Sequence, residues 1–181
     1  MISTSNSAVD QFGSATQNCD IRVLCLGNDL LGDDSLGSRL AAHVRQFAPA
    51  SVDVVATPET GLHLLDYALN VRRLIVVDTV VTGSAPPGTI YEFHDTDLKS
   101  PPGGSPHYVG LFEALAVARH LCLPAPEEVL ILAVEATNCS TIGEDIHPAV
   151  VAAIPVLITM VRDRIGASVG DIAPTKKEIA A

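Results

Sequence analysis

Residues 27–37 have the sequence Gly27-Asn28-Asp29-Leu30-Leu31-Gly32-Asp33-Asp34-Ser35-Leu36-Gly37. The preceding run, 21–26, is largely apolar and has the length of a buried strand. The following segment, 38–47, carries apolar residues at helical spacing. The stretch therefore joins a first strand to a first helix, which is where open α/β sheets bind their ligands. Because it holds three aspartates and no lysine, this loop favours a cation over a phosphate group.

The rest of the chain continues the same alternation of strands and helices. Further strands are predicted at 51–56, 72–78, 89–93 and 128–134. Helices are predicted at 35–47, 62–69, 108–122 and 148–165, the last one kinked or restarted at Pro155. This order predicts a three-layer α/β/α fold, with a doubly wound, mostly parallel sheet of about five strands and one antiparallel edge strand. We expect one domain at 21–165, a disordered or loosely attached segment at 1–20, and a frayed tail at 166–181.

Composition narrows the class of protein. Apolar residues make up 48% of the 181 residues and aromatic residues only 4%, which is typical of a Val, Leu, Ile and Ala core around a parallel sheet. The net charge of −10 argues against nucleic acid and against anionic membrane surfaces as partners. The cysteines are scattered, without C-x-x-C spacing, and residues 1–20 do not resemble a signal peptide. We therefore expect a cytoplasmic protein with free thiols.

Three side chains far apart in the sequence are candidates for one site. In a doubly wound sheet the first and third strands are commonly neighbours, so the loop with Asp33 and Asp34 should meet Asp78, which is predicted to end the third strand. His107 lies where a long loop meets a helix. Two carboxylates and an imidazole form an open, three-ligand site for a divalent metal such as Ni, Zn or Mn. Another molecule would have to supply the remaining ligands.

Simpler explanations of these residues remain open from the sequence alone. Asp33 and Asp34 could cap the first helix, Asp78 could cap a turn, and a single histidine is often a surface or capping residue. Nucleophilic catalysis by serine or cysteine has little support, because no serine lies in a nucleophile-elbow motif and Cys139 has no obvious base partner.

Four motifs, in order along the chain, resemble one known family. The stretch 27–37 resembles the G-N-x-L-x-x-D-[DE]-x-x-G signature of the nickel–iron hydrogenase maturation endopeptidases. Three further segments match that family's later motifs: a strand with Asp at 74–80, a P-G-T turn and strand at 87–90, and an S-x-H-x-x-G-L segment at 105–111. The similarity covers about residues 21–165.

The resemblance implies that Asp34, Asp78 and His107 bind nickel and carry catalysis. It also implies a protease that removes a C-terminal extension from the hydrogenase large-subunit precursor. On this resemblance, the protease is expected to act after nickel insertion, to recognise the nickel of the precursor, and to have no organic cofactor. Residues implied to contact this substrate are Gly27, Asn28, Asp33, Thr57, Glu59 and Thr60. Two departures stand out: many family members have Glu at position 34, and many have a G-G-T-type segment where this chain has 57–61, a loop that could select the precursor.

The sequence leaves both the nucleophile and two rival functions open. A metal could polarise the scissile carbonyl or activate water, or Asp33 or Asp34 could act as a general base with a raised pKa. One rival function is a receiver-like, Mg-binding phosphoacceptor domain, although such a domain needs a lysine after its last strand and residues 100–175 contain none. The other is a nickel-sensing chaperone that binds the precursor without cutting it.

Overall fold

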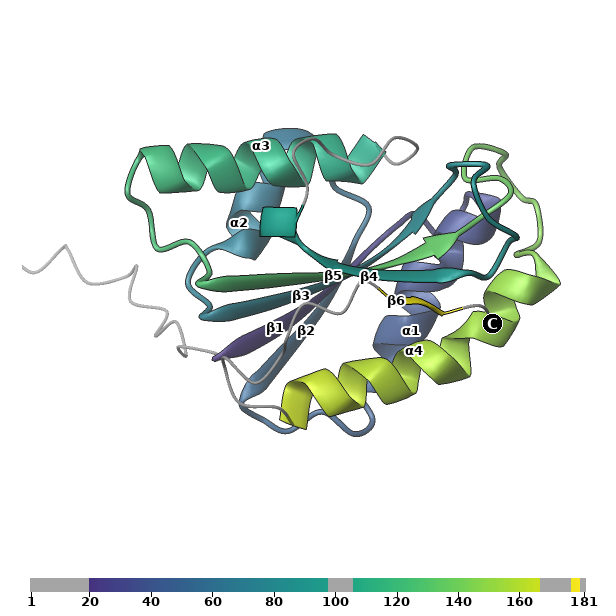
Figure 1. Cartoon of the computed structure of the whole chain (residues 1–181), viewed down its shortest axis with the longest axis horizontal. Helices are drawn as coiled ribbons and strands as arrows, with labels where there is room; N and C mark the ends of the chain where they lie inside the picture. The colour runs from purple at the N-terminus through teal and green to yellow at the C-terminus, as the bar shows by residue number, and fades with distance from the viewer. Residues whose placement is uncertain (1–19, 98–105, 167–176, 180–181) are drawn as a thin grey trace, which may run out of the picture.

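A computed structural model describes residues 20–97, 106–166 and 177–179 of the chain. The strands are β1 Ile21–Leu26, β2 Val52–Thr57, β3 Arg73–Val80, β4 Ile90–His94, β5 Glu128–Glu135 and β6 Lys177–Ile179. The α-helices are α1 Leu36–Val44, α2 Leu65–Ala68, α3 Pro106–His120 and α4 Pro148–Gly166. Short 3-10 helices are η1 Gly32–Ser35, η2 Gly61–Leu64 and η3 Asp95–Asp97. Helices lie on both faces of one sheet (Figure 1), which confirms the predicted three-layer α/β/α architecture.

The strand order is β2-β1-β3-β5-β4-β6. β1 pairs in parallel with β2 and β3, and β3 pairs in parallel with β5, whereas β4 is antiparallel to β5. The doubly wound, mostly parallel sheet and the neighbouring first and third strands are therefore as predicted. One difference is that β6 pairs antiparallel with β4, so β4 is not the edge of the sheet. Most of the two predicted terminal segments, 1–19, 167–176 and 180–181, lies outside the described residues. Asp20, the last residue of the predicted N-terminal segment, is described, and its carboxylate pairs with Arg72.

The core consists of two layers because the central strands are apolar on both faces, as expected for parallel strands covered by helices. Successive residues of β1, such as Val23 and Leu24, face opposite layers. α1 and α4 cover one face and α2 and α3 cover the other (Figure 1). In the part of the chain that the structure describes, no helix combines the length and apolar character needed to cross a bilayer.

Two predicted element boundaries at the site were wrong. β3 does not end at Asp78 but continues to Val80, because residues 78–80 still pair with β5 after β1 has ended opposite Val77. Asp78 is thus the first residue of β3 beyond the register of β1, and it still lies at the predicted crevice. α3 begins at Pro106, so His107 lies in the first turn of the helix and not before it.

Two predicted helices also differ in form. The segment predicted as a helix at 62–69 is a 3-10 turn, η2, followed by the single turn of α2. α4 continues through Pro155, so of the two predicted alternatives, a kink or a restart, the restart does not occur. Buried apolar residues on both sides of the proline, Ile154 and Leu157, hold the helix against the sheet and offset the backbone hydrogen bond that proline cannot donate.

Glu135, at the end of β5, organises the loop between β3 and β4, a role that the sequence did not suggest. Its side chain is 1% exposed and accepts hydrogen bonds from the amide and hydroxyl of Thr82, the amide of Gly83 and the hydroxyl of Tyr91. Burial raises the pKa of Glu135, but these hydrogen bonds outweigh it and leave the pKa below its ordinary value. The carboxylate therefore stabilises the fold mainly in its ionised form.

We expect Glu135→Gln to lower the free energy of unfolding at pH 7 by about 2 kcal/mol, because an amide cannot accept all four hydrogen bonds. A lowered native pKa stabilises the protein above the unfolded pKa of about 4.3 and ceases to do so as the pH falls through the native pKa. The difference between variant and wild type should therefore shrink in acid. Urea denaturation at pH 7 and at about pH 3 measures this. The exposed Glu127→Gln is the control, and a difference that persists unchanged at the lower pH contradicts the assignment.

Candidate functional site

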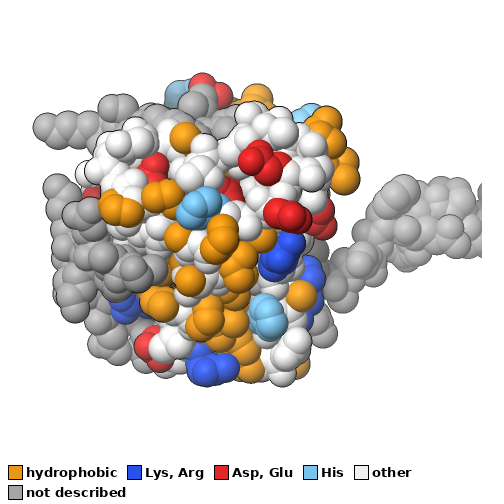
Figure 2. Space-filling view, turned by 90° about the vertical axis from the view of Figure 1, so that its right-hand side faces the viewer, with side chains coloured by type: hydrophobic (Ala, Val, Ile, Leu, Met, Phe, Trp, Pro, Cys, Tyr) orange, Lys and Arg blue, Asp and Glu red, His pale blue; other side chains and the backbone are white. Residues whose placement is uncertain are grey.

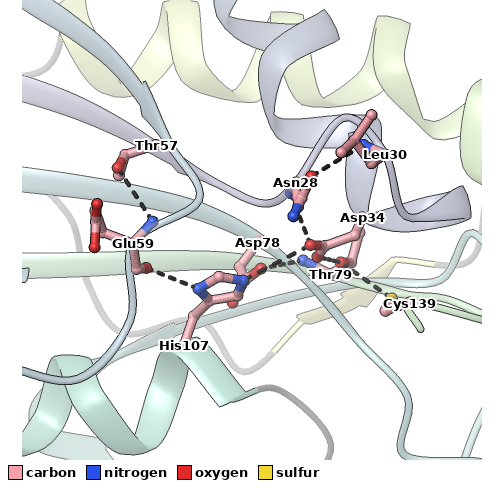
Figure 3. A network of polar contacts seen from close by, with 9 residues as sticks. All are labelled: Asn28, Leu30, Asp34, Thr57, Glu59, Asp78, Thr79, His107 and Cys139. Atoms are coloured by element: carbon pink, nitrogen blue, oxygen red, sulfur yellow. Dashed lines mark hydrogen bonds and ion pairs between the residues drawn. The ribbon is translucent and has the colours of Figure 1, made fainter. Parts of the chain in front are cut away.

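Asp34, Asp78 and His107 meet at the carboxyl ends of β1 and β3. Each offers one ligand atom, the three atoms lie within 4.8 Å of one another, and all three side chains are buried. Asp34 comes from η1, Asp78 from β3 and His107 from the first turn of α3. Figure 3 shows the imidazole pointing from α3 toward both carboxylates. We refer to these three residues as the ligand cluster.

Asp34 is held by two donors, one on each carboxylate oxygen. The backbone amide of Asn28 donates to Oδ2 at 2.7 Å, and the hydroxyl of Thr79 donates to Oδ1 at 3.0 Å (Figure 3). No side-chain cap bond is made at the start of η1 or α1, so the helix-capping explanation of Asp33 and Asp34 is not supported. Asp34 is instead a buried acceptor that faces the other cluster residues.

The orientation of His107 is set by a backbone carbonyl. Nδ1 lies 3.0 Å from the carbonyl oxygen of Glu59, and because a carbonyl can only accept, Nδ1 must carry the proton and donate it. Nε2 then faces Oδ2 of Asp34 at 3.8 Å. This is the arrangement in which a histidine presents one nitrogen to a metal while a hydrogen bond fixes the other.

The charge balance of the cluster favours a cation. Burial lowers the pKa of His107, but the nearby carboxylate of Asp34, the charge of Asp78 and the hydrogen bond to the carbonyl of Glu59 outweigh it and hold the pKa above its ordinary value. Two buried carboxylates, 5% and 1% exposed at Asp34 and Asp78, are costly to bury without positive charge nearby. Two carboxylate oxygens and one imidazole nitrogen form a donor set that suits Ni, Zn or Mn.

Asp33 does not belong to this cluster, although it adjoins Asp34. Its side chain is 2% exposed and accepts hydrogen bonds from the amide and hydroxyl of Thr137 and from the amides of Asn138 and His147. Burial raises the pKa of Asp33, but these donors outweigh it and leave the pKa below its ordinary value. The hypothesis of a general base with a raised pKa is therefore wrong for Asp33, which instead connects the first loop to the loop before α4.

We expect Asp33→Asn to lower the free energy of unfolding by about 3 kcal/mol, because its amide group would face donors that the carboxylate now satisfies. The exposed Asp29→Asn is the matched control and should change stability by less than about 0.5 kcal/mol. Urea denaturation of both variants measures the difference. Equal stability of the two variants contradicts the structural role of Asp33.

Among the other predicted substrate contacts, Gly27, Asn28 and Thr57 have a structural role. A Cβ at Gly27 would lie 2.1 Å from the backbone oxygen of Asp34, and its φ of +138° disfavours any other residue. The backbone amide of Asn28 donates a hydrogen bond to Asp34, and its side-chain oxygen Oδ1 accepts one from the backbone amide of Leu30. Thr57 is buried and its hydroxyl accepts from the amide of Glu59. These contacts shape the two loops on either side of the ligand cluster.

The side chains of Glu59 and Thr60 are exposed and remain available to a substrate. The loops after β1, β3 and β5 also expose apolar side chains, those of Leu30, Val81 and Ile142. Figure 2, which looks at the right-hand end of Figure 1, shows apolar side chains across the middle of this face and acidic ones gathered in its upper part. The surface at this end of the molecule can therefore offer both apolar and charged contacts.

The fold and the ligand cluster define a class, namely α/β proteins with a buried candidate metal site at the switch point of a doubly wound sheet. A family model described as hydrogenase maturation protease matches residues 36–164. The chain belongs to the hydrogenase maturation protease family. The match begins after Asp34.

Individual relatives agree with this family. The hydrogenase 2 maturation protease of Escherichia coli K12 is 32% identical over 103 residues, which are 55% of this chain and 63% of that protein. The match thus spans less than two thirds of that relative. The structure of the hydrogenase maturating endopeptidase HybD from E. coli is 26% identical, with a TM-score of 0.70, covering 81% of this chain and 91% of that one. A maturation protease from Thermococcus kodakarensis, 20% identical with a TM-score of 0.60 over 80% of this chain and 98% of that one, shares the fold.

Proposed function

We propose that the chain is an endopeptidase that removes the C-terminal extension of a nickel–iron hydrogenase large-subunit precursor after nickel insertion. The observation that carries the proposal is the ligand cluster, in which three ligand atoms converge within 4.8 Å. Membership in the hydrogenase maturation protease family supports peptidase activity, and the name of the E. coli relative supports the class of substrate.

The cluster supports nickel recognition because its ligand set is incomplete. Two carboxylates and an imidazole leave coordination positions for donors from another molecule. A precursor that already holds nickel supplies both the ion and the remaining donors. Nickel is thus part of the substrate, and the enzyme carries no organic cofactor.

The geometry supports a positioning mechanism. Oδ2 of Asp34 and Nε2 of His107 face each other at 3.8 Å, so a nickel ion between them and Asp78 would fix the scissile bond relative to the enzyme. Water is the nucleophile that this site supports, because burial raises the pKa of Cys139 to about 12 and its thiol therefore stays protonated at neutral pH. The carboxylate of Asp33, a candidate general base, accepts hydrogen bonds from Thr137 and His147 instead. Nickel can polarise the carbonyl or the water, and a carboxylate of the cluster can accept the proton.

The test is the mass of the precursor after incubation with the purified chain. A nickel-loaded precursor should lose its C-terminal extension, and a nickel-free precursor should remain intact. Binding without cleavage identifies a nickel-sensing chaperone instead. Cleavage of both precursors at equal rates contradicts nickel recognition but not peptidase activity. The family match argues against the receiver-like alternative, for which phosphodonor labelling at Asp78 is the direct test.

A further inference from the structure

Thr79 contacts both carboxylates of the ligand cluster, although neither the motifs nor the family match singles it out. Its backbone amide donates to Oδ1 of Asp78 at 2.7 Å, and its hydroxyl donates to Oδ1 of Asp34 at 3.0 Å. The side chain is 3% exposed, so water does not compete for these bonds. One residue of β3 therefore fixes one oxygen on each of two acids that lie 44 residues apart in the sequence.

The hydroxyl of Thr79 is itself oriented by a second neighbour. Sγ of Cys139, in the loop after β5, lies 3.4 Å from Oγ1 of Thr79. A carboxylate can only accept, so the threonine proton must point to Asp34 and the thiol must donate to the threonine oxygen. Burial keeps Cys139 protonated, with a pKa raised to about 12. The hydrogen bonds therefore run in one direction, from Cys139 to Thr79 to Asp34 (Figure 3).

The fold alone does not require this hydroxyl. β3 is a buried strand of largely branched apolar residues, and valine has the shape and strand preference of threonine. A valine at position 79 would fill the same space, but Oδ1 of Asp34 would lose the hydrogen bond that the threonine hydroxyl donates. The polar side chain is therefore better explained by the cluster than by the strand.

We propose that Thr79 is a positioning residue, which holds the carboxylate of Asp34 so that Oδ2 faces His107 and the nickel of the substrate. This proposal rests on the proposed function of the cluster. Hydrogen bonds from surrounding residues to metal ligands typically change metal affinity by about 10- to 100-fold when they are removed. Cys139 does not contact Asp34 in this chain of hydrogen bonds but orients the threonine hydroxyl. Its removal should therefore change metal affinity less than removal of the hydroxyl does.

The test compares Thr79→Val, Thr79→Ser and Cys139→Ala in the full chain, with Ni²⁺ alone as the probe. Thr79→Val should weaken Ni²⁺ binding by about 10-fold or more, Thr79→Ser should restore it to within about 3-fold, and Cys139→Ala should change it by less than about 3-fold. The matched control is Thr89→Val, which removes another buried threonine hydroxyl, one that donates to the carbonyl of Pro86. This control should bind Ni²⁺ as the wild type does.

A second measurement uses the nickel-loaded precursor, for which kcat/KM should fall about 10-fold in Thr79→Val and recover in Thr79→Ser. Wild-type values in Thr79→Val for both Ni²⁺ binding and processing overturn the proposal, and so does a failure of Thr79→Ser to recover. If Asp78→Asn binds Ni²⁺ and processes precursor as the wild type does, the proposed nickel site itself fails. If Asp78→Asn loses both activities and Thr79→Val keeps both, only the role of Thr79 is wrong.

Discussion

His107→Ala is expected to slow the processing of nickel-loaded precursor by about 10³-fold or more while the chain remains folded. The imidazole is the only nitrogen donor in the ligand cluster, and its Nδ1 is already committed to the carbonyl of Glu59. Its removal leaves Asp34 and Asp78 as the two remaining ligands of the cluster. Timed mass measurements of the precursor give the rate, and urea denaturation checks the fold.

The control for this variant is His43→Ala, which removes an exposed histidine on α1. It should process the precursor at the wild-type rate. If His107→Ala also processes at that rate, the cluster is not the active site, whatever the family. Loss of processing together with loss of cooperative unfolding requires a repeat with His107→Gln, a polar side chain that fills more of the space.

The pH dependence of processing should also reflect His107. Burial lowers the pKa of His107, but the neighbouring carboxylates of Asp34 and Asp78 outweigh this effect and raise the pKa in the folded chain. The protonated form is therefore favoured at low pH, and nickel must displace that proton to bind Nε2. The value of kcat/KM is expected to decrease as the pH is lowered through this raised pKa. A profile that is flat in this region contradicts direct metal binding by the imidazole.

The position of the cluster could be predicted because it follows from topology. Asp34 lies in the acidic loop between the first strand and the first helix, and Asp78 lies in the third strand. The first and third strands are commonly neighbours in a doubly wound sheet, which places Asp34 beside Asp78. His107 was found through its place between a loop and a helix and through motif resemblance. The approach of all three ligand atoms to within 4.8 Å is the geometric outcome of those patterns.

The supporting contacts could not be predicted, because they depend on register and on distant loops. Thr79 lies beside the ligand cluster only because β3 extends along β5 past the end of its pairing with β1. The partners of Asp33 lie more than 100 residues away in the sequence, so the adjacent acids of the first motif could not be assigned different roles. The orientation of His107 depends on a backbone carbonyl of Glu59, which no side-chain pattern encodes.

The close packing of α3 against η2 is a further feature of this kind, and it determines where His107 lies. A Cβ at Gly110 would be 2.2 Å from the nitrogen and 2.4 Å from the Cα of Gly61. Residues 107 and 110 are three apart in α3 and therefore lie on the same face of the helix. The contact between the two glycines thus brings the chain next to Gly61, including the carbonyl of Glu59, against the imidazole of His107.

Gly110→Ala is accordingly expected to impair both stability and processing. The added methyl group meets backbone atoms, which cannot rotate away, so α3 and η2 must separate, at a cost of about 3 kcal/mol in the free energy of unfolding. A shift of about 1 Å at His107 should slow processing by about 100-fold. Gly166→Ala is the control, because a Cβ there meets no atom of the described residues within 4 Å. Urea denaturation and precursor processing measure the two effects. If Gly110→Ala is less stable but processes the precursor at the wild-type rate, the position of the imidazole does not depend on this glycine contact.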